Sequence, residues 1–218
     1  MNVLAFETAG PLIGVSLYTG GKAHVMMERI QRGADAKLIP WAVLLAEKAG
    51  IALSELDGVA VSFGPGGFTG LRVGMATAAG LAQSLNIPVW GNSSLHHRAM
   101  RVDSDRTLSM LDARKSRVYA CLYGRGGQVL HGPGDVPPEE AVAWAGGHGV
   151  VATGEGSLVY ADLLGQAGIP IAAEADSPAV DTLARLGAEA IEAGSGEDAL
   201  SVRPKYLRAP DAKKSKDR

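Results

Sequence analysis

The two halves of this chain share one order of expected secondary structure, which constrains the fold more than any single motif. In the first half, hydrophobic periodicity and turn residues indicate three strands, a helix, a strand and a helix, at residues 2–7, 12–18, 23–30, 35–50, 57–63 and 69–85. The same order recurs at 107–113, 117–123, 128–131, 137–145, 149–153 and 157–166. A further strand at 169–173 and an amphipathic helix at 177–194 follow. Each half reads β-β-β-α-β-α, so the sequence predicts an α/β chain of two lobes.

A duplicated unit of this kind is the architecture of the actin-like ATPase superfamily (ASKHA, ribonuclease H-like), which is the expected fold class. The expected boundaries are an N-terminal lobe at 1–101, a C-terminal lobe at 102–202 and a flexible basic tail at 203–218. The tail carries 7 basic and 2 acidic side chains, whereas the rest of the chain carries 14 and 21. Such a tail can neutralise nucleic-acid phosphates or remain a solvated end, and both interpretations stay open.

Cysteine content and hydropathy argue against two other classes of protein. A single cysteine, Cys121, cannot form an internal disulfide framework or a cysteine-based zinc site. No apolar run approaches the roughly 20 residues that span a bilayer, and the start of the chain lacks the pattern of a signal peptide. We therefore expect a cytoplasmic protein with no membrane partner.

The sequence indicates neither a metal site nor a catalytic motif. His96 and His97 are neighbours, so on a helix their side chains diverge and cannot hold one ion. The other histidines are scattered, and neither G-x-S-x-G nor GxxxxGK[ST] occurs. We expect no catalytic residue, no metal ion and no cofactor bound by this chain alone.

Glu7 and Thr8 are the weak candidates for a nucleotide site, because they end the first expected strand. A carboxylate there could contact Mg²⁺ through water, although a turn or capping role is the favoured interpretation. A matching phosphate loop in the second half would fall near Asp112, where the sequence reads "LDARKSRVY" without a glycine pair. An actin-like ATPase or kinase relative with its own nucleotide site is the alternative function.

The segment "GPGGFTGLRVG" at 64–74 is interpreted as a tight turn from strand to helix. It lacks the G-x-G-x-x-G spacing of a dinucleotide-binding loop and follows the fourth expected strand. From Thr69 to Asn86 the only charged residue is Arg72, and apolar or small residues occupy more than one face. A helix of this kind is buried on several sides, so we expect it to lie half in the core and half in a subunit interface.

These segments resemble the TsaB (YeaZ-type) family over almost the whole chain. "FGPGGFTGLRVGMATAAGLAQSLNIPVWGNSSL" is similar to the family's central motif, and "FETAGPLIGVSLY", "MLDARKSRVYACLY" and "RPKYLR" are similar to its opening hairpin, its DAR segment and its ending. Glu7 and Ala9 replace the family's Asp and Ser, and Gly67 replaces its usual Ser. The first two replacements weaken a nucleotide role for the hairpin.

The resemblance implies a non-catalytic subunit that binds TsaD, the transferase of the complex. With the ATPase TsaE, these proteins place threonylcarbamoyl on N6 of the adenosine beside the anticodon of tRNAs that read ANN codons. ATP or ADP and a metal ion are then expected in the partner subunits, and tRNA is contacted indirectly.

The resemblance also places the interface on the two long helices of the first lobe, and a homodimer could use the same surface. The expected interface residues are Ile39, Val43, Leu71, Met75, Ala78, Ala79 and Ala82.

Overall fold

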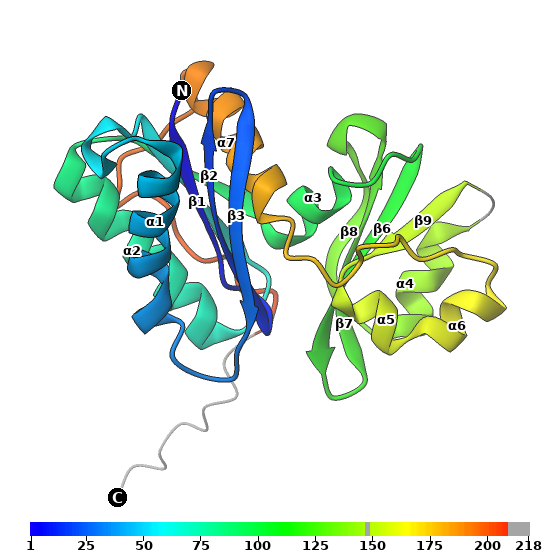
Figure 1. Cartoon of the computed structure of the whole chain (residues 1–218). Coiled ribbons are helices and arrows are strands. Elements are labelled where there is room, and N and C mark those ends of the chain that lie inside the picture. Colours follow the sequence, from blue (N-terminus) through cyan, green and yellow to red (C-terminus); the bar gives the residue numbers. More distant parts are fainter. Residues whose placement is uncertain (147–148, 209–218) are drawn as a thin grey trace, which may run out of the picture.

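Two mixed β-sheets with helices on their faces make up the protein. The computed structural model describes residues 1–146 and 149–208. Figure 1 shows two lobes side by side, each built around one sheet. The expected two-lobed, actin-like α/β fold is confirmed.

The first lobe contains the five-stranded sheet, with strand order β3-β2-β1-β4-β5. Its elements are β1 (Val3–Glu7), β2 (Leu12–Thr19), β3 (Lys22–Arg29), α1 (Asp35–Ala49), the 3-10 helix η1 (Leu53–Glu55), β4 (Gly58–Gly64), α2 (Phe68–Leu85), β5 (Val89–Ser93) and α3 (Ser94–Ala99). The central strand β1 pairs antiparallel with β2 and parallel with β4. All five residues of β1 are buried, so the sheet needs a cover on both faces.

Helices α1 and α2 cover one face of this sheet, as Figure 1 shows. Leu38 and Leu45 of α1 and Ala78 of α2 are buried in the core that they share with Phe6. Gly50 ends α1 with a φ of 72°, a left-handed conformation that glycine adopts at low cost.

The second lobe contains a four-stranded sheet of order β8-β7-β6-β9. Its elements are β6 (Arg106–Arg114), β7 (Arg117–Gly124), η2 (Arg125–Gly127), β8 (Val129–Val136), α4 (Pro138–Ala145), β9 (Val150–Thr153), α5 (Glu155–Val159) and α6 (Ala161–Gln166). The last helix of the chain, α7, is Val180–Glu192.

Two expected elements of the second lobe differ from the structure. The helix expected at 157–166 is divided into α5 and α6 at Tyr160, whose side chain packs against the core of this lobe. The strand expected at 169–173 forms only an isolated bridge between Ile171 and Ala152. Pro170 accepts a hydrogen bond from the Ala152 N–H but has no N–H to donate, which limits the ladder.

Helix α7 returns to the first lobe and covers the second face of its sheet, which corrects the expected lobe at 102–202. Val180, Leu183 and Ala184 form one apolar cluster with side chains of β1 and β4. Figure 1 places α7 on the face of the first sheet opposite α1 and α2. The physical reason is the two-sided burial of β1, because α1 and α2 cover only one side.

The expected flexible tail at 203–218 also needs correction for its first part. Residues 203–208 are placed against both lobes, where the Lys205 N–H donates to the Phe63 carbonyl at 2.9 Å and Arg208 pairs with Asp135 at 2.7 Å. Residues 209–218 lie outside the described residues, so the RNA-binding interpretation of the tail is an expectation that remains open.

Within the described ranges, none of the helices combines the length and the apolar character that crossing a bilayer requires.

Candidate functional site

The carboxylate of Glu7 ends β1 inside the protein, where the chain's own donors occupy it. Glu7 Oε1 accepts a hydrogen bond from the Ala9 N–H at 2.6 Å. Its Oε2 accepts one from Arg98 Nη1 at 3.1 Å and lies 2.7 Å from His97 Nε2. Both partners come from α3, about ninety residues further along the chain. Glu7 therefore holds α3 against the end of β1.

Electrostatics show that this group is an ion pair in the folded state. Burial alone would raise the pKa of Glu7, but Arg98, His97 and the Ala9 N–H outweigh it and lower the pKa to about 2. Burial lowers the pKa of His97, although the contact with Glu7 opposes that shift. Because Glu7 is fully buried and satisfied within the chain, its structural role replaces the weak hypothesis of a water-mediated Mg²⁺ contact.

Sequence reasoning missed the partners of Glu7. It interpreted His97 through its neighbour His96 and found no chelating pair, whereas His97 is fully buried and points to Glu7 and to the Pro178 carbonyl, 3.2 Å from its Nε2. Adjacent histidine and arginine on a short helix give no local sign that they meet an acid from the first strand. The one available signal was the acid itself, which closes an otherwise apolar strand.

Thr8 explains the glycines that follow β4. Its Oγ1 donates to the Gly70 carbonyl at 2.8 Å. A Cβ at Gly70 would lie 2.1 Å from the Thr8 carbonyl oxygen, and a Cβ at Gly74 would lie 2.2 Å from Thr8 Oγ1. The glycines thus let the first turns of α2 approach the β1–β2 hairpin, in addition to forming the turn that we expected.

A cleft of about 1110 Å³ separates the two lobes. The β1–β2 hairpin and the start of α2 line one side, and the β6–β7 hairpin and α5 line the other. Asp112, Arg114, Lys115 and Glu155 bring charges to the second side. Burial raises the pKa of the Glu155 carboxyl group above its ordinary value, although the nearby Arg98 opposes that shift.

The cleft joins Thr8 to the Asp112 loop, as the alternative nucleotide hypothesis requires, but it leaves Glu7 behind the hairpin. In the described part of the chain, no three His, Cys, Asp or Glu side chains are grouped so that they could hold a metal ion.

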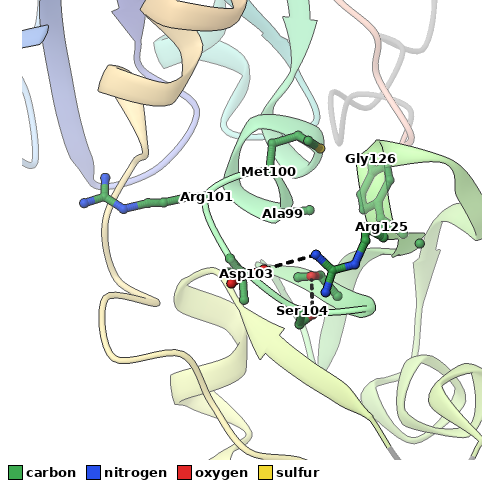
Figure 2. A pocket seen from close by; sticks show the side chains of 11 residues that line it. Ala99, Met100, Arg101, Asp103, Ser104, Arg125 and Gly126 are labelled. Carbon is green, nitrogen blue, oxygen red and sulfur yellow. Dashed lines mark hydrogen bonds and ion pairs between the residues drawn. The ribbon is translucent and has the colours of Figure 1, made fainter. Parts of the chain in front are cut away.

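A second, smaller pocket of about 250 Å³ lies between the end of α3 and the β7–η2 connection. Figure 2 shows Arg125 pointing across its edge towards Asp103. The Arg125 pairs measure 3.3 Å to Asp103 and 2.9 Å to Asp105. One arginine thus pairs with two acids at this edge, which keeps one net negative charge.

The expected interface residues divide into two groups. Leu71, Met75, Ala78 and Ala82 are buried within the chain itself. Their assignment to a partner surface is therefore wrong, since they already pack inward against the first lobe. Ile39 is 38% exposed, and Val43 and Ala79 are half-buried, so these three remain accessible.

The outer side of α2 presents small residues. Ala76 and Gly80 are exposed, and they follow the exposed Arg72 at intervals of four residues. This spacing puts all three on one face of the helix. On α1, Ile39 and Leu44 are exposed. We call the exposed side of these two helices the outer helical face.

Comparisons with known proteins agree over most of the chain. The model of the family described as "TsaD: tRNA N6-adenosine threonylcarbamoyltransferase" matches residues 25–214. YeaZ from Pseudomonas aeruginosa has a TM-score of 0.81 and 30% identity, and the match covers 94% of this chain and 99% of that one. Another P. aeruginosa structure, of an uncharacterized protein similar to peptidase YEAZ, has a TM-score of 0.83 and 32% identity. That match covers 95% of this chain and 99% of the other one.

Curated relatives match over shorter stretches. An uncharacterized protein of Mycobacterium leprae is 40% identical over 153 residues, which are 66% of this chain and 42% of that protein. The tRNA threonylcarbamoyladenosine biosynthesis protein TsaB of Escherichia coli is 31% identical over 129 residues, covering 57% of this chain and 56% of TsaB. The matches thus span about half the length of these two relatives.

The fold and the inward-facing charges define a two-lobed, actin-like protein whose first hairpin is closed by an internal ion pair. The family match and the two Pseudomonas aeruginosa structures show that the chain belongs to the TsaB (YeaZ-type) family.

Proposed function

We propose that this chain is a non-catalytic subunit in the biosynthesis of threonylcarbamoyladenosine on tRNA. In this proposal it binds and supports a TsaD-type transferase, which carries out the transfer to N6 of adenosine. The family match and the names of the relatives support the pathway. ATP or ADP and a metal ion then belong to the partner subunits, among them a TsaE-type ATPase, and tRNA is contacted through the assembly.

The observation that carries the partner-binding role is the outer helical face. Helix α2 has 18 residues and a single charged side chain, Arg72. Its exposed positions include Ala76 and Gly80, where small side chains let a second helix approach closely. A Cβ at Gly80 would meet nothing within 4 Å, so this surface is open in the isolated chain. Apolar and small faces of this kind favour contact with another protein.

The burial of Glu7 and its pairing with Arg98 support the non-catalytic role. An independent ATPase in this fold would use an accessible acid on the first hairpin, and here that acid is neutralised by Arg98. This observation makes the nucleotide-site alternative the less favoured function.

Gly80→Arg tests the proposal in a mixture of the full chain with its cognate TsaD-type subunit. A bulky charge in the centre of the outer helical face should prevent co-elution, because it must be desolvated or excluded from the interface. Gly165→Arg in α6 is the matched control, since this glycine is also exposed and helical with open space around it. Co-elution of the Gly80→Arg chain at the wild-type level would refute the interface. If two copies of this chain pair through the same face, the chain alone should form a homodimer that Gly80→Arg dissociates.

A further inference from the structure

Two cations beside the outer helical face contact aromatic rings. The Arg72 guanidinium lies 5.9 Å from the ring centroid of Phe68 and 5.8 Å from that of Tyr206. The Lys205 Nζ lies 4.4 Å from the ring centroid of Phe63. Many other cations of this chain pair with acids, as Arg29 does with Asp176. We call Phe68, Arg72, Lys205 and Tyr206 the cationic–aromatic cluster.

The C-terminal segment holds this cluster in a fixed arrangement. The rings of Tyr206 and Phe68 have centroids 4.6 Å apart, and the Tyr206 hydroxyl accepts a hydrogen bond from Arg72 Nε at 3.0 Å. On one side of Tyr206, the Lys205 N–H donates to the Phe63 carbonyl at 2.9 Å.

On the other side of Tyr206, Arg208 donates two hydrogen bonds of 2.7 and 2.9 Å to Asp135 of the second lobe. A segment fixed at both ends loses little conformational entropy when its side chains bind a partner.

The cluster is continuous with the outer helical face. Arg72 precedes Ala76 by four residues and Gly80 by eight, so one stripe of α2 runs from the cation to the small residues. Arg72, Lys205 and Tyr206 are exposed. Tyrosine and arginine are enriched at the energetically dominant positions of protein interfaces, and lysine is not. A partner that covers Ala76 and Gly80 would therefore reach this cluster with its next turn or loop.

We propose that the cationic–aromatic cluster is the charged end of the partner surface and receives a carboxylate-bearing segment of the partner protein. The inference rests on the proposed function, because it extends the same surface. One hydrogen bond to Tyr206 fixes Arg72 Nε and leaves the terminal nitrogens of the guanidinium to contact a carboxylate. The partner thus carries aspartate or glutamate beside the helix that packs on Ala76 and Gly80.

Charge reversal tests the inference. The Kd of the full chain for its TsaD-type partner is measured for Arg72→Glu and Lys205→Glu. Lys22→Glu, at the exposed first residue of β3, is the control. We expect Arg72→Glu to weaken binding at least about tenfold, because like charges would then meet. Lys205→Glu should act in the same direction and Lys22→Glu should bind as the wild type does. The loss caused by neutral Arg72→Gln should shrink as salt concentration rises.

The outcomes separate this inference from the proposed function. If Gly80→Arg abolishes binding while Arg72→Glu and Lys205→Glu bind normally, the carboxylate contact is refuted and the outer helical face stands. If Gly80→Arg binds normally, the outer helical face is not the partner surface. The proposed function is then refuted, together with the inference that extends that surface. If Arg72→Glu keeps the partner but loses affinity for tRNA, the cluster contacts phosphate and the inference is overturned. Circular dichroism of each variant verifies that it is folded, and Arg72→Gln replaces Arg72→Glu if the latter is not.

Discussion

The buried pair of Glu7 with Arg98 joins the end of β1 to α3 at the centre of the molecule. The Glu7 carboxylate is fully buried, and Arg98 supplies the charge that makes this burial tolerable. An unpaired charge in such a place costs several kcal/mol, whereas a complete pair is close to neutral relative to an apolar core. The arrangement therefore ties two distant segments together, since neither partner can leave without exposing the other to an apolar environment.

Removing one partner should consequently be far more costly than breaking a surface pair. We expect Glu7→Gln to lower the free energy of unfolding by about 3–5 kcal/mol, because it removes the carboxylate that pairs with the buried Arg98. Urea denaturation followed by circular dichroism measures the change. Glu189→Gln is the control, because it breaks the exposed Arg185–Glu189 pair at 2.6 Å and should cost about 0.5 kcal/mol or less. Equal losses in the two variants would contradict the role assigned to Glu7.

The same pair predicts how stability depends on pH. The folded-state pKa of Glu7 is about 2, below its ordinary 4.5, so its contribution is complete above pH 4.5 and is lost as the pH falls towards 2. Burial lowers the pKa of His97 below 6.5, so protonation of His97 also costs stability as the pH falls below 6.5. Urea titrations from about pH 8 to about pH 3 should show stability decreasing through both windows. In Glu7→Gln the lower window should flatten, and an unchanged acid limb would argue against this assignment.

At the scale of elements, α2 shows how much a sequence pattern can settle. Its near absence of charge correctly indicated a helix that is buried along much of its length. Apolar or small residues occupy more than one face of α2, however, so the pattern could not tell the core side from the outer side. Packing decided it, because Leu71 and Met75 fill the space above the sheet and leave Ala76 outside. The partners of Glu7 and the target of α7 had no local signal, since both depend on contacts between distant segments.

The glycines of α2 should respond to substitution in opposite directions. Gly70→Ala would place a Cβ 2.1 Å from the Thr8 carbonyl, so the hairpin or the helix must shift, at a cost of about 1–3 kcal/mol. Gly80→Ala meets nothing within 4 Å and should stabilise the helix by up to about 1 kcal/mol. Thermal unfolding of the two variants and the wild type measures both effects. A destabilised Gly80→Ala with an unaffected Gly70→Ala would show that the helix is rotated relative to this description.

At the scale of the whole molecule, the chain does not divide where its repeated element order suggests. Helix α7 covers the first sheet and follows the whole second lobe in sequence, so the first lobe is completed only when the end of the chain is in place. Gly187 shows how close this packing is, because a Cβ there would lie 2.5 Å from the Ala60 Cβ. Arg101, just after α3, hydrogen-bonds Ser177 at 3.2 Å and Asp181 at 2.7 Å, which brings the two ends of the first lobe together.

This connectivity predicts which fragment of the chain folds. Residues 1–101 alone should not unfold cooperatively, because the sheet face formed by Val3, Ala5 and Ala60 would be exposed to water. A chain in which residue 102 is joined by a short glycine–serine linker to residues 176–208 restores α7 and should show one cooperative transition. Leu183 is fully buried in that contact, so Leu183→Asp in the linked chain is the negative control. Cooperative folding of 1–101 by itself would mean that α1 and α2 suffice to stabilise the sheet, and that α7 is an addition to the lobe rather than a part of it.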